Sequence, residues 1–283
     1  MESQDQNWTQ IIEPHGHVLE LRLHELWRYR DLILLFVHRD FVAQYKQTIL
    51  GPAWHFIQPL LTTIMFTIVF GKIAKIPTDG VPPFIFYMSG IVIWTYFANV
   101  LTATSSTFTG NAEIFGKVYF PRLAIPVANL LSKLIAFAIQ FFFFVCFLGY
   151  YIWEGAEIQP NIWVLATPLL LLMMAALALG LGIIISAMTT RYRDLTILVG
   201  FGVQLLMYAS PIIYPLSTLP EEWRFWAGLN PIASIVGLFR HAYLGAGSVD
   251  IILLGYSFLL ISGILFVGIL MFNKVERTFM DTV

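Results

Sequence analysis

The most regular feature of this sequence is a series of long apolar stretches separated by short polar connections. A helix of about 20 apolar residues is long enough to cross a bilayer. Because hydrocarbon offers the backbone no hydrogen-bond partner, and because these stretches lack the alternation of a membrane β-barrel, we predict helices. Six stretches of about this length contain no Asp, Glu or Arg and lie at residues 54–71, 84–108, 123–153, 162–188, 195–213 and 251–273.

The pattern therefore predicts an all-α integral membrane protein, with six transmembrane helices in a membrane domain that comprises residues 51–283. Several glycines lie inside the predicted spans, among them Gly180, Gly182, Gly200 and Gly202. Small residues in membrane helices let neighbouring backbones approach each other. We expect these glycines to serve close helix packing rather than phosphate binding.

The region before the first span has two parts. Residues 1–17 are polar and irregular and are expected to form a tail, whereas residues 18–50 show a helical, amphipathic pattern. Arg39, Asp40 and Lys46 lie largely outside the apolar stripe of this helix. The stripe consists of Leu34, Val37, Phe41 and Tyr45. We predict that the helix lies along the cytoplasmic membrane surface, and packing on another subunit is the alternative.

The connection between the fifth and sixth predicted spans, at residues 214–248, is too long for a turn and too apolar for a solvated loop. Prolines divide it into two segments, 223–229 and 232–244, which are each too short to cross a bilayer. We predict two short re-entrant or interfacial helices in the outer leaflet. Their notable residues are Trp223, Trp226 and Arg240. Arg240 would face either the lipid headgroups or a water-filled mouth.

The charged residues indicate the class of protein and its orientation. They make up 12% of the 283 residues, against about 25% in an ordinary soluble domain. Most basic residues of the connections lie on one side of the membrane if the N-terminus is cytoplasmic, as the positive-inside rule requires. The sequence therefore predicts a multi-pass protein with both termini in the cytoplasm.

The sequence offers little for catalysis or for ion coupling. No predicted span holds a carboxylate, the usual coupling group of proton- and sodium-driven transporters, and Lys133 is the only charged residue well inside a span. A phosphate-binding loop, a zinc-binding His-Glu-x-x-His motif and a nucleophile elbow are absent. Cys146, the single cysteine, excludes an intrachain disulfide and a cysteine-cluster metal site. We predict a non-enzymatic protein without a metal or cofactor of its own, powered by a partner.

Two other classes of protein stay open. A self-powered secondary transporter or channel is one, because neutral side chains and unwound backbone also bind ions. A membrane-embedded acyl- or glycosyltransferase is the other, although it would need paired acids or a histidine-centred group, and no convincing cluster appears. A nucleic-acid partner is not expected, since the chain has no fold signature for one.

The connections contain four distinctive blocks of sequence. In chain order these are Arg39-Asp40 with residues 45–54 (YKQTILGPAW) and Gln58-Pro59, residues 117–122 (KVYFPR) with Pro126, residues 191–195 (RYRDL), and Asn230-Pro231 with Phe239-Arg240 and Leu244-Gly245. Together they cover the chain from about Glu25 to its C-terminus. In this order the blocks resemble the permeases of polysaccharide-exporting ABC transporters, the O-antigen and teichoic-acid exporters of the Wzm and TarG kind.

The resemblance implies a half-transporter in the bacterial cytoplasmic (inner) membrane. Such a permease pairs with a second copy of itself and with two copies of a cytoplasmic ABC ATPase, which binds ATP and Mg²⁺. In these exporters the amphipathic helix and the short connection after the second span contact the ATPase. Carried onto this chain, the coupling residues are Asp40, Gln44, Lys46, Asn111, Glu113, Phe115 and Lys117, with Arg191, Arg193 and Asp194 as a further contact.

The cargo that the resemblance implies is a polysaccharide on a polyprenyl pyrophosphate or related lipid; a drug or small lipid is the closest alternative. A pyrophosphate calls for cations near the cytoplasmic surface, although positive-inside topology alone would also place most of them there. The candidates are Arg39, Lys46, Arg122 and Lys133.

A sugar conduit is expected to be rich in aromatic rings, because the C–H faces of sugars pack on them. The conduit candidates are Phe66, Phe70, Trp94, Tyr96, Phe97 and Tyr208. The alternative for these rings is an interfacial belt or packing against neighbouring helices. Our hypothesis is that two copies of the first and fifth spans frame the conduit.

Overall fold

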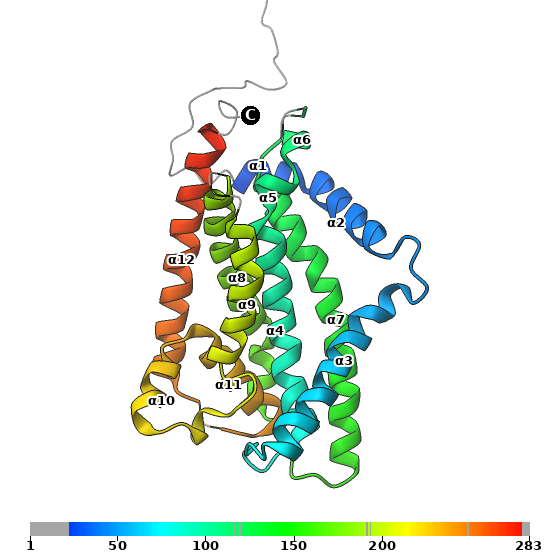
Figure 1. Cartoon of the computed structure of the whole chain (residues 1–283), viewed down its shortest axis with the longest axis vertical. Helices are drawn as coiled ribbons and strands as arrows, with labels where there is room; N and C mark the ends of the chain where they lie inside the picture. Colours follow the sequence, from blue (N-terminus) through cyan, green and yellow to red (C-terminus); the bar gives the residue numbers. More distant parts are fainter. Residues whose placement is uncertain are drawn as a thin grey trace, which may run out of the picture.

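A computed structural model describes residues 23–278 except 116, 119, 191, 193 and 248. Within these residues the chain is helical and contains no strand, which confirms the all-α prediction (Figure 1). The elements are α1 (Leu23–Arg28), α2 (Arg30–Tyr45), η1 (Gly51–Ala53), α3 (Trp54–Phe66), η2 (Thr67–Ile73), α4 (Pro83–Ser105), α5 (Thr107–Gly110), α6 (Ala112–Phe115), α7 (Ala124–Trp153), η3 (Ile162–Ala166), α8 (Thr167–Thr189), α9 (Leu195–Ala209), η4 (Leu216–Thr218), α10 (Glu221–Gly228), α11 (Pro231–Leu244) and α12 (Ile251–Thr278). The predicted tail, residues 1–17, lies outside the described residues.

Five helical segments are long and apolar enough to cross a membrane, so the chain is a multi-pass membrane protein. They are Gly51–Ile73, Pro83–Ser105, Ala124–Trp153, Ile162–Thr189 and Ile251–Val275, and they correspond to the first, second, third, fourth and sixth predicted spans. The predicted fifth span is α9, an apolar helix of 15 residues. Because Ser210 adopts an extended conformation and Pro211 follows it, α9 ends before it reaches the length of the others.

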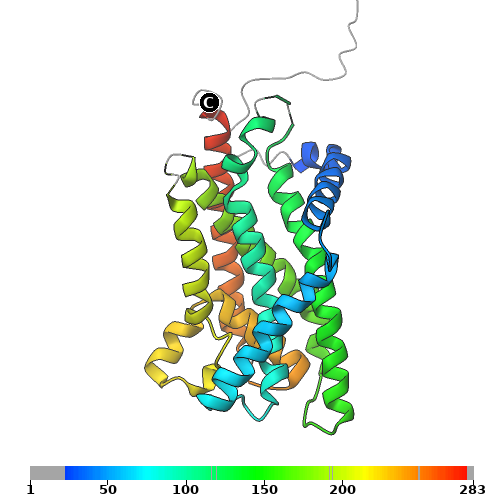
Figure 2. The same ribbon diagram turned by 45° about the vertical axis from the view of Figure 1, so that its right-hand side comes forward.

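The long helices stand side by side, with α4 in the middle of the bundle (Figures 1 and 2). The end that carries α1, α6 and the end of α12 is called the upper end here, as drawn in Figure 1, and the end that carries α10 and α11 the lower end. In the most apolar stretch of α4, 78% of the residues are buried inside the protein, whereas 11% are buried in the corresponding stretch of the segment that contains α3. The main core therefore surrounds α4, while α3 lies at the edge of the bundle.

Glycines bring α8 close to two of its neighbours. A Cβ atom on Gly180 would lie 2.9 Å from the Cα of Leu265 on α12, and one on Gly182 would lie 2.6 Å from the Cβ of Thr104 on α4. These two glycines serve close packing, as predicted. At Gly200 and Gly202 of α9, by contrast, a Cβ would meet no atom within 4 Å, so close packing is not their role within this chain.

Gly180→Ala is expected to lower the stability of the folded chain by about 1–3 kcal/mol, the usual cost of overpacking. Its added carbon would meet the backbone of α12, which has little freedom to move away. Gly263→Ala, on α12, is the matched control. It has open space around its Cβ, and alanine favours a helix over glycine by about 1 kcal/mol. Thermal unfolding in detergent should therefore give opposite signs, and equal midpoints would contradict this account.

The amphipathic helix predicted before the first span corresponds to α1 and α2, but the predicted stripe is wrong in part. Leu34 is 60% exposed, and the buried side chains of α2 are Ile33 and Phe36. The helix packs its buried side against α7 of the same chain. Because apolar side chains occur on both sides of α2, periodicity alone could not identify the buried one. Asp40 lies on the packed side, contrary to its predicted place.

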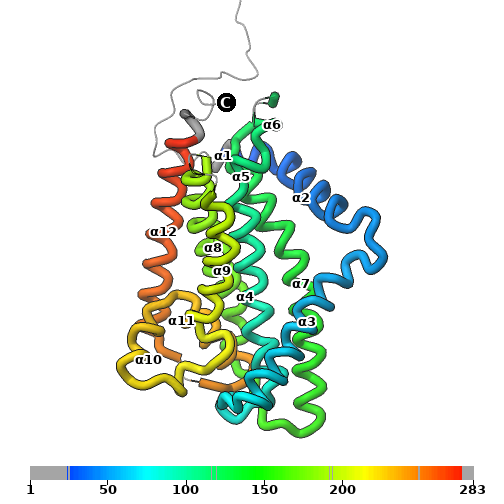
Figure 3. Tube along the Cα trace, viewed as in Figure 1, coloured from blue at the N-terminus to red at the C-terminus, as the bar shows by residue number. Residues whose placement is uncertain are grey.

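The amphipathic helix reaches the first membrane helix through a sharp turn at residues 46–53. Figures 1 and 3 show the chain running along α2 away from the centre of the bundle, reversing at this turn and descending as α3. Gly51 has a φ of +51°, a conformation that side chains other than glycine rarely adopt, and Pro52 starts the helical turn that leads into α3. This reversal places the end of α2 beside the beginning of α3.

Candidate functional site

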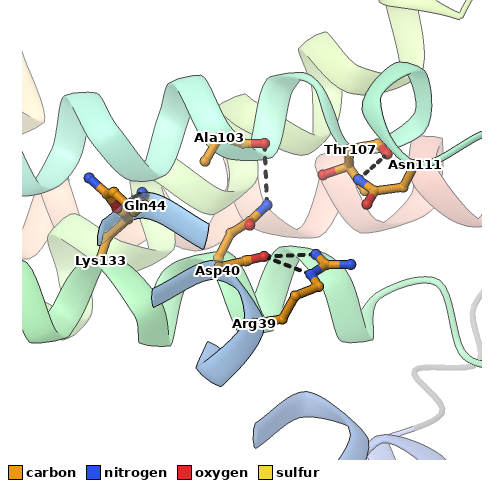
Figure 4. Close-up of polar contacts among 8 residues, drawn as sticks. Arg39, Asp40, Gln44, Ala103, Thr107, Asn111 and Lys133 are labelled. Carbon is orange, nitrogen blue, oxygen red and sulfur yellow. Dashed lines mark hydrogen bonds and ion pairs between the residues drawn. The ribbon is translucent and has the colours of Figure 1, made fainter. Parts of the chain in front are cut away.

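A polar contact joins α2 to the membrane helix α7 (Figure 4). The ammonium of Lys133, on α7, donates to Oε1 of Gln44 on α2 at 3.5 Å. Asp40 lies one helical turn before Gln44, and its negative charge acts on Lys133. Arg39 pairs with Asp40, with 2.8 Å between Nη2 and Oδ1. In this α2–α7 polar contact, Asp40 is therefore ion-paired with Arg39 and lies within the electrostatic range of Lys133.

Two further polar groups extend the α2–α7 polar contact toward α3. His55, in the first turn of α3, interacts electrostatically with Lys133, and its ring centroid lies 5.2 Å from that of Tyr45. The Tyr45 hydroxyl is buried and has no hydrogen-bond partner within the described part of the chain. An ammonium, an imidazole and a hydroxyl can each donate a hydrogen bond to an anionic oxygen. The sequence pattern placed Tyr45 only in the apolar stripe and did not single out His55. The turn at Gly51 and Pro52 was the signal that could have brought the two residues together.

The four predicted phosphate-binding cations do not form one cluster. Arg39 pairs with Asp40, and the charge of the same carboxylate acts on Lys133. Arg122, in contrast, is buried, and its guanidinium carbon lies 5.4 Å from the ring centroid of Phe115. Lys46 is exposed directly after α2. Because Arg122 is buried against Phe115, the structure favours Lys133, on the membrane helix α7, as the residue that binds the phosphate.

A second core lies at the upper end, and five of its ten buried residues are phenylalanines. This upper aromatic cluster contains Phe36 of α2, Phe108 of α5, Phe115 of α6, Phe272 of α12, and Phe120, which lies just before α7. The ring centroids of Phe108 and Phe272 are 4.7 Å apart, and those of Phe36 and Phe120 are 5.5 Å apart. The amphipathic helix, the connection after α4 and the end of α12 therefore share one core.

The predicted coupling residues lie in different surroundings, and Asp40 belongs to the α2–α7 polar contact. Phe115 is buried in the upper aromatic cluster, so its ring packs inside the protein and does not face a partner. The Asn111 side chain donates to the carbonyl of Thr107 at 3.0 Å (Figure 4). The exposed group comprises Gln44, Lys46, Glu113, Lys117 and Asp194. Arg191 and Arg193 lie outside the described residues.

The predicted conduit aromatics do not share one surface. Trp94, Tyr96 and Phe97 of α4 are buried in the main core, where the Tyr96 and Phe137 ring centroids are 5.5 Å apart. Phe66 and Phe70 are half-buried on the segment that contains α3, and Tyr208 of α9 is exposed. The rings on α3 and α9 are therefore the ones that a sugar could reach in this conformation.

Two short helices, α10 and α11, occupy the region between α9 and α12. Trp223 and Trp226 of α10 are exposed. Arg240 of α11 faces neither headgroups nor a water-filled mouth, so both sequence-based alternatives are wrong. It is 5% exposed, and its guanidinium donates to the carbonyls of Pro211 and Ile212. The reason is that α11 packs on α4 and α12, which surrounds its side chains with protein.

No group of three or more metal-ligating side chains occurs in the part of the chain that the structure describes. The family profile described as "ABC-2 type transporter" matches residues 31–244. An O-antigen export system permease protein RfbA of Klebsiella pneumoniae is 28% identical over 255 residues, which cover 89% of this chain and 94% of the relative. The protein of the same name from Myxococcus xanthus is 27% identical, over 76% and 81% of the two chains. The polysialic acid transport protein KpsM of Escherichia coli is 18% identical, over 86% and 93%.

Proposed function

The chain belongs to the ABC-2 type transporter family, and on this premise we propose that it is the permease subunit of an ABC transporter that exports a lipid-linked polysaccharide. The observation that carries the proposal is the similarity to permeases named for O-antigen export, which extends over 94% of such a relative. The proposed complex contains two copies of this chain and two copies of an ATPase that binds ATP and Mg²⁺. It works in the bacterial cytoplasmic membrane, and this chain performs no catalysis itself.

In this proposal the upper end is cytoplasmic and α9 is the fifth of six spans. Two copies of the chain then frame a polysaccharide conduit with α3 and α9. Both helices leave most of their surface uncovered within one chain, which is what a surface shared with a second copy and a cargo needs. The open space at Gly200 and Gly202 supports a close approach on the same surface.

The ATPase is proposed to bind at the upper end, against α2 and the connection that contains α6. Glu113 and Lys117 are the exposed charged residues of that connection, and they lie on either side of the buried Phe115. Glu113, Lys117 and Phe115 belong to one short segment. A movement of the ATPase that displaces the two charged residues would therefore also displace the upper aromatic cluster. This arrangement supports the assignment of the coupling contact to the surface next to that cluster.

The α2–α7 polar contact is proposed to bind the phosphate of the carrier lipid through Lys133. Lys133→Met should weaken the binding of a polyprenyl phosphate about tenfold or more, because a hydrogen bond to a charged group contributes about 1.5–3 kcal/mol. Methionine keeps the length and helix propensity of the side chain. Lys72→Met, an exposed lysine of η2 at the lower end, is the matched control. Binding measured by titration in detergent should distinguish them, and equal dissociation constants would remove Lys133 from the site.

The proposed function is tested by its cargo. The chain is purified in mild detergent together with the ATPase encoded beside it, and the accompanying lipids are identified by mass spectrometry. A glycan on a polyprenyl carrier is expected. A preparation that carries no such glycan, and that transports a drug or a small lipid when reconstituted, would replace this proposal with the alternative cargo.

A further inference from the structure

Arg240 is a charged side chain enclosed by protein. Its Nη1 donates to the carbonyl of Pro211 at 2.7 Å and its Nη2 to that of Ile212 at 2.6 Å. The guanidinium carbon lies 3.8 Å from the ring centroid of Phe86, and Nε donates to Oγ of Ser89 at 3.3 Å. Burying a cation away from water is costly unless its donors are satisfied, so these contacts hold the side chain in one place.

The neighbouring helix α4 is shaped to admit the guanidinium. A Cβ on Gly90 would lie 2.7 Å from Nη2 of Arg240 and 3.0 Å from the Ile212 carbonyl oxygen. Glycine at this position therefore leaves the space in which the cation and the carbonyl meet. No carboxylate forms a salt bridge with Arg240 among the described residues. The two backbone carbonyls are thus the principal polar partners of the charge, and both belong to the turn after α9.

The same helix α11 holds this turn at a second point. Asn230, at the beginning of α11, donates to Oγ of Ser210 at 2.9 Å, and its Oδ1 accepts the backbone N–H of Ile232. Ser210 and Ile212 are fully buried. The turn that ends α9 is therefore fixed into the main core at two points of α11, its N-cap residue and Arg240, through three hydrogen bonds.

The body of α9 is packed far less. Val199 is the one buried side chain among its 15 residues. Ile197 is 79% exposed, and Leu198 and Phe201 are also exposed. A helix whose lower end is fixed in a core and whose upper part is largely uncovered can change its tilt without breaking many contacts within its own chain.

We propose that Arg240 is a positioning residue that, with Asn230, fixes the lower end of α9, so that α9 pivots about residues 210–212 when its upper end moves. The inference rests on the proposed function for the source of the movement, which is ATP binding by the partner subunit. A guanidinium suits this task better than an ammonium, because its planar fork satisfies two carbonyls at once. The pivot lets the upper part of α9 move while the lower end of the bundle keeps its structure.

The test uses the complete complex with its ATPase, in a Cys146→Ser background, and measures distances between pairs of spin labels. One pair, at Leu198 and Val267, reports the upper part of α9 relative to α12. The other pair, at Tyr208 and Phe258, reports its lower end. Singly labelled complexes identify distances between subunits. We expect a non-hydrolysable ATP analogue to shift the upper distance and to leave the lower distance unchanged.

Variants then test the role of Arg240 itself. Arg240→Lys and Gly90→Ala should each broaden the distance distribution of the lower pair. Arg224→Lys is the matched control, because Arg224 also donates to two carbonyls, those of Ser217 and Leu219, but does not hold α9. The proposal is overturned if the lower distance shifts as far as the upper one in the unsubstituted chain, or if Arg240→Lys leaves it as narrow as Arg224→Lys does. If Arg240→Lys fails to fold, the comparison in the unsubstituted chain and Gly90→Ala decide. If the complex carries no polyprenyl-linked glycan but the lower distance stays unchanged, the proposed function is contradicted and the pivot is not.

Discussion

Phe108→Ala is expected to separate ATP hydrolysis from transport, with export falling to background while the ATPase stays active. Phe108 is fully buried between Phe115 of α6 and Phe272 of α12. Its backbone N–H also donates to Oγ of Ser186 on α8 at 3.2 Å. Removing a buried phenylalanine ring costs about 3–5 kcal/mol. That loss acts on the segment that joins the proposed ATPase contact to the membrane helices.

The measurement for Phe108 has two parts. Hydrogen exchange should accelerate in α5 and α6, and sugar exported per ATP hydrolysed should drop in proteoliposomes. Phe142→Ala is the matched control, since Phe142 is exposed on α7 and outside both cores. If Phe108→Ala matched Phe142→Ala in exchange and in export, the upper aromatic cluster would not transmit movement.

The long membrane helices were predictable because the bilayer imposes one simple rule on sequence. Every backbone polar group at membrane depth must find a partner within the chain, so an uninterrupted apolar run implies a helix. Five of the six predicted spans are long helices for this reason. The fifth predicted span extends too far toward the C-terminus. Apolar residues continue through Pro211 to Ile213, although the helix ends at Ala209. Hydropathy does not distinguish a membrane helix from the buried turn that follows it.

The placement of individual polar side chains was less predictable, because it depends on contacts between distant parts of the sequence. Arg240 looked like a residue for headgroups or water, yet its partners are backbone carbonyls 28 and 29 positions away and a space left by Gly90. Asp40 was expected away from the packed side of α2, yet it lies on that side, where its charge acts on Lys133 of α7. The surroundings of Arg240 and Asp40 cannot be identified from the residues next to them in the sequence.

The aromatic residues illustrate the same limit. Trp94, Phe97, Phe66 and Tyr208 are all aromatic residues within apolar runs. The sequence therefore offered no reason to distinguish rings that a sugar could reach from rings that are buried. The structure does, because α4 is enclosed by other helices and α3 and α9 are not. A conduit built from the segment that contains α3 and from α9 would therefore rely on the candidates Phe66, Phe70 and Tyr208, and not on the three candidates of α4.

The purified chain, reconstituted without its partner, is expected to move no cargo, and adding the ATPase with Mg²⁺ and ATP should restore export fully. The chain has no phosphate-binding loop, and its predicted spans hold no carboxylate that could couple transport to an ion gradient. Export is measured as protection of labelled glycan inside proteoliposomes. An ATPase variant whose phosphate-loop lysine is replaced serves as control, because it keeps the protein contact but cannot hydrolyse ATP. Accumulation of glycan by this chain alone would show that its energy does not come from a partner, and the self-powered alternative would then replace the ABC mechanism.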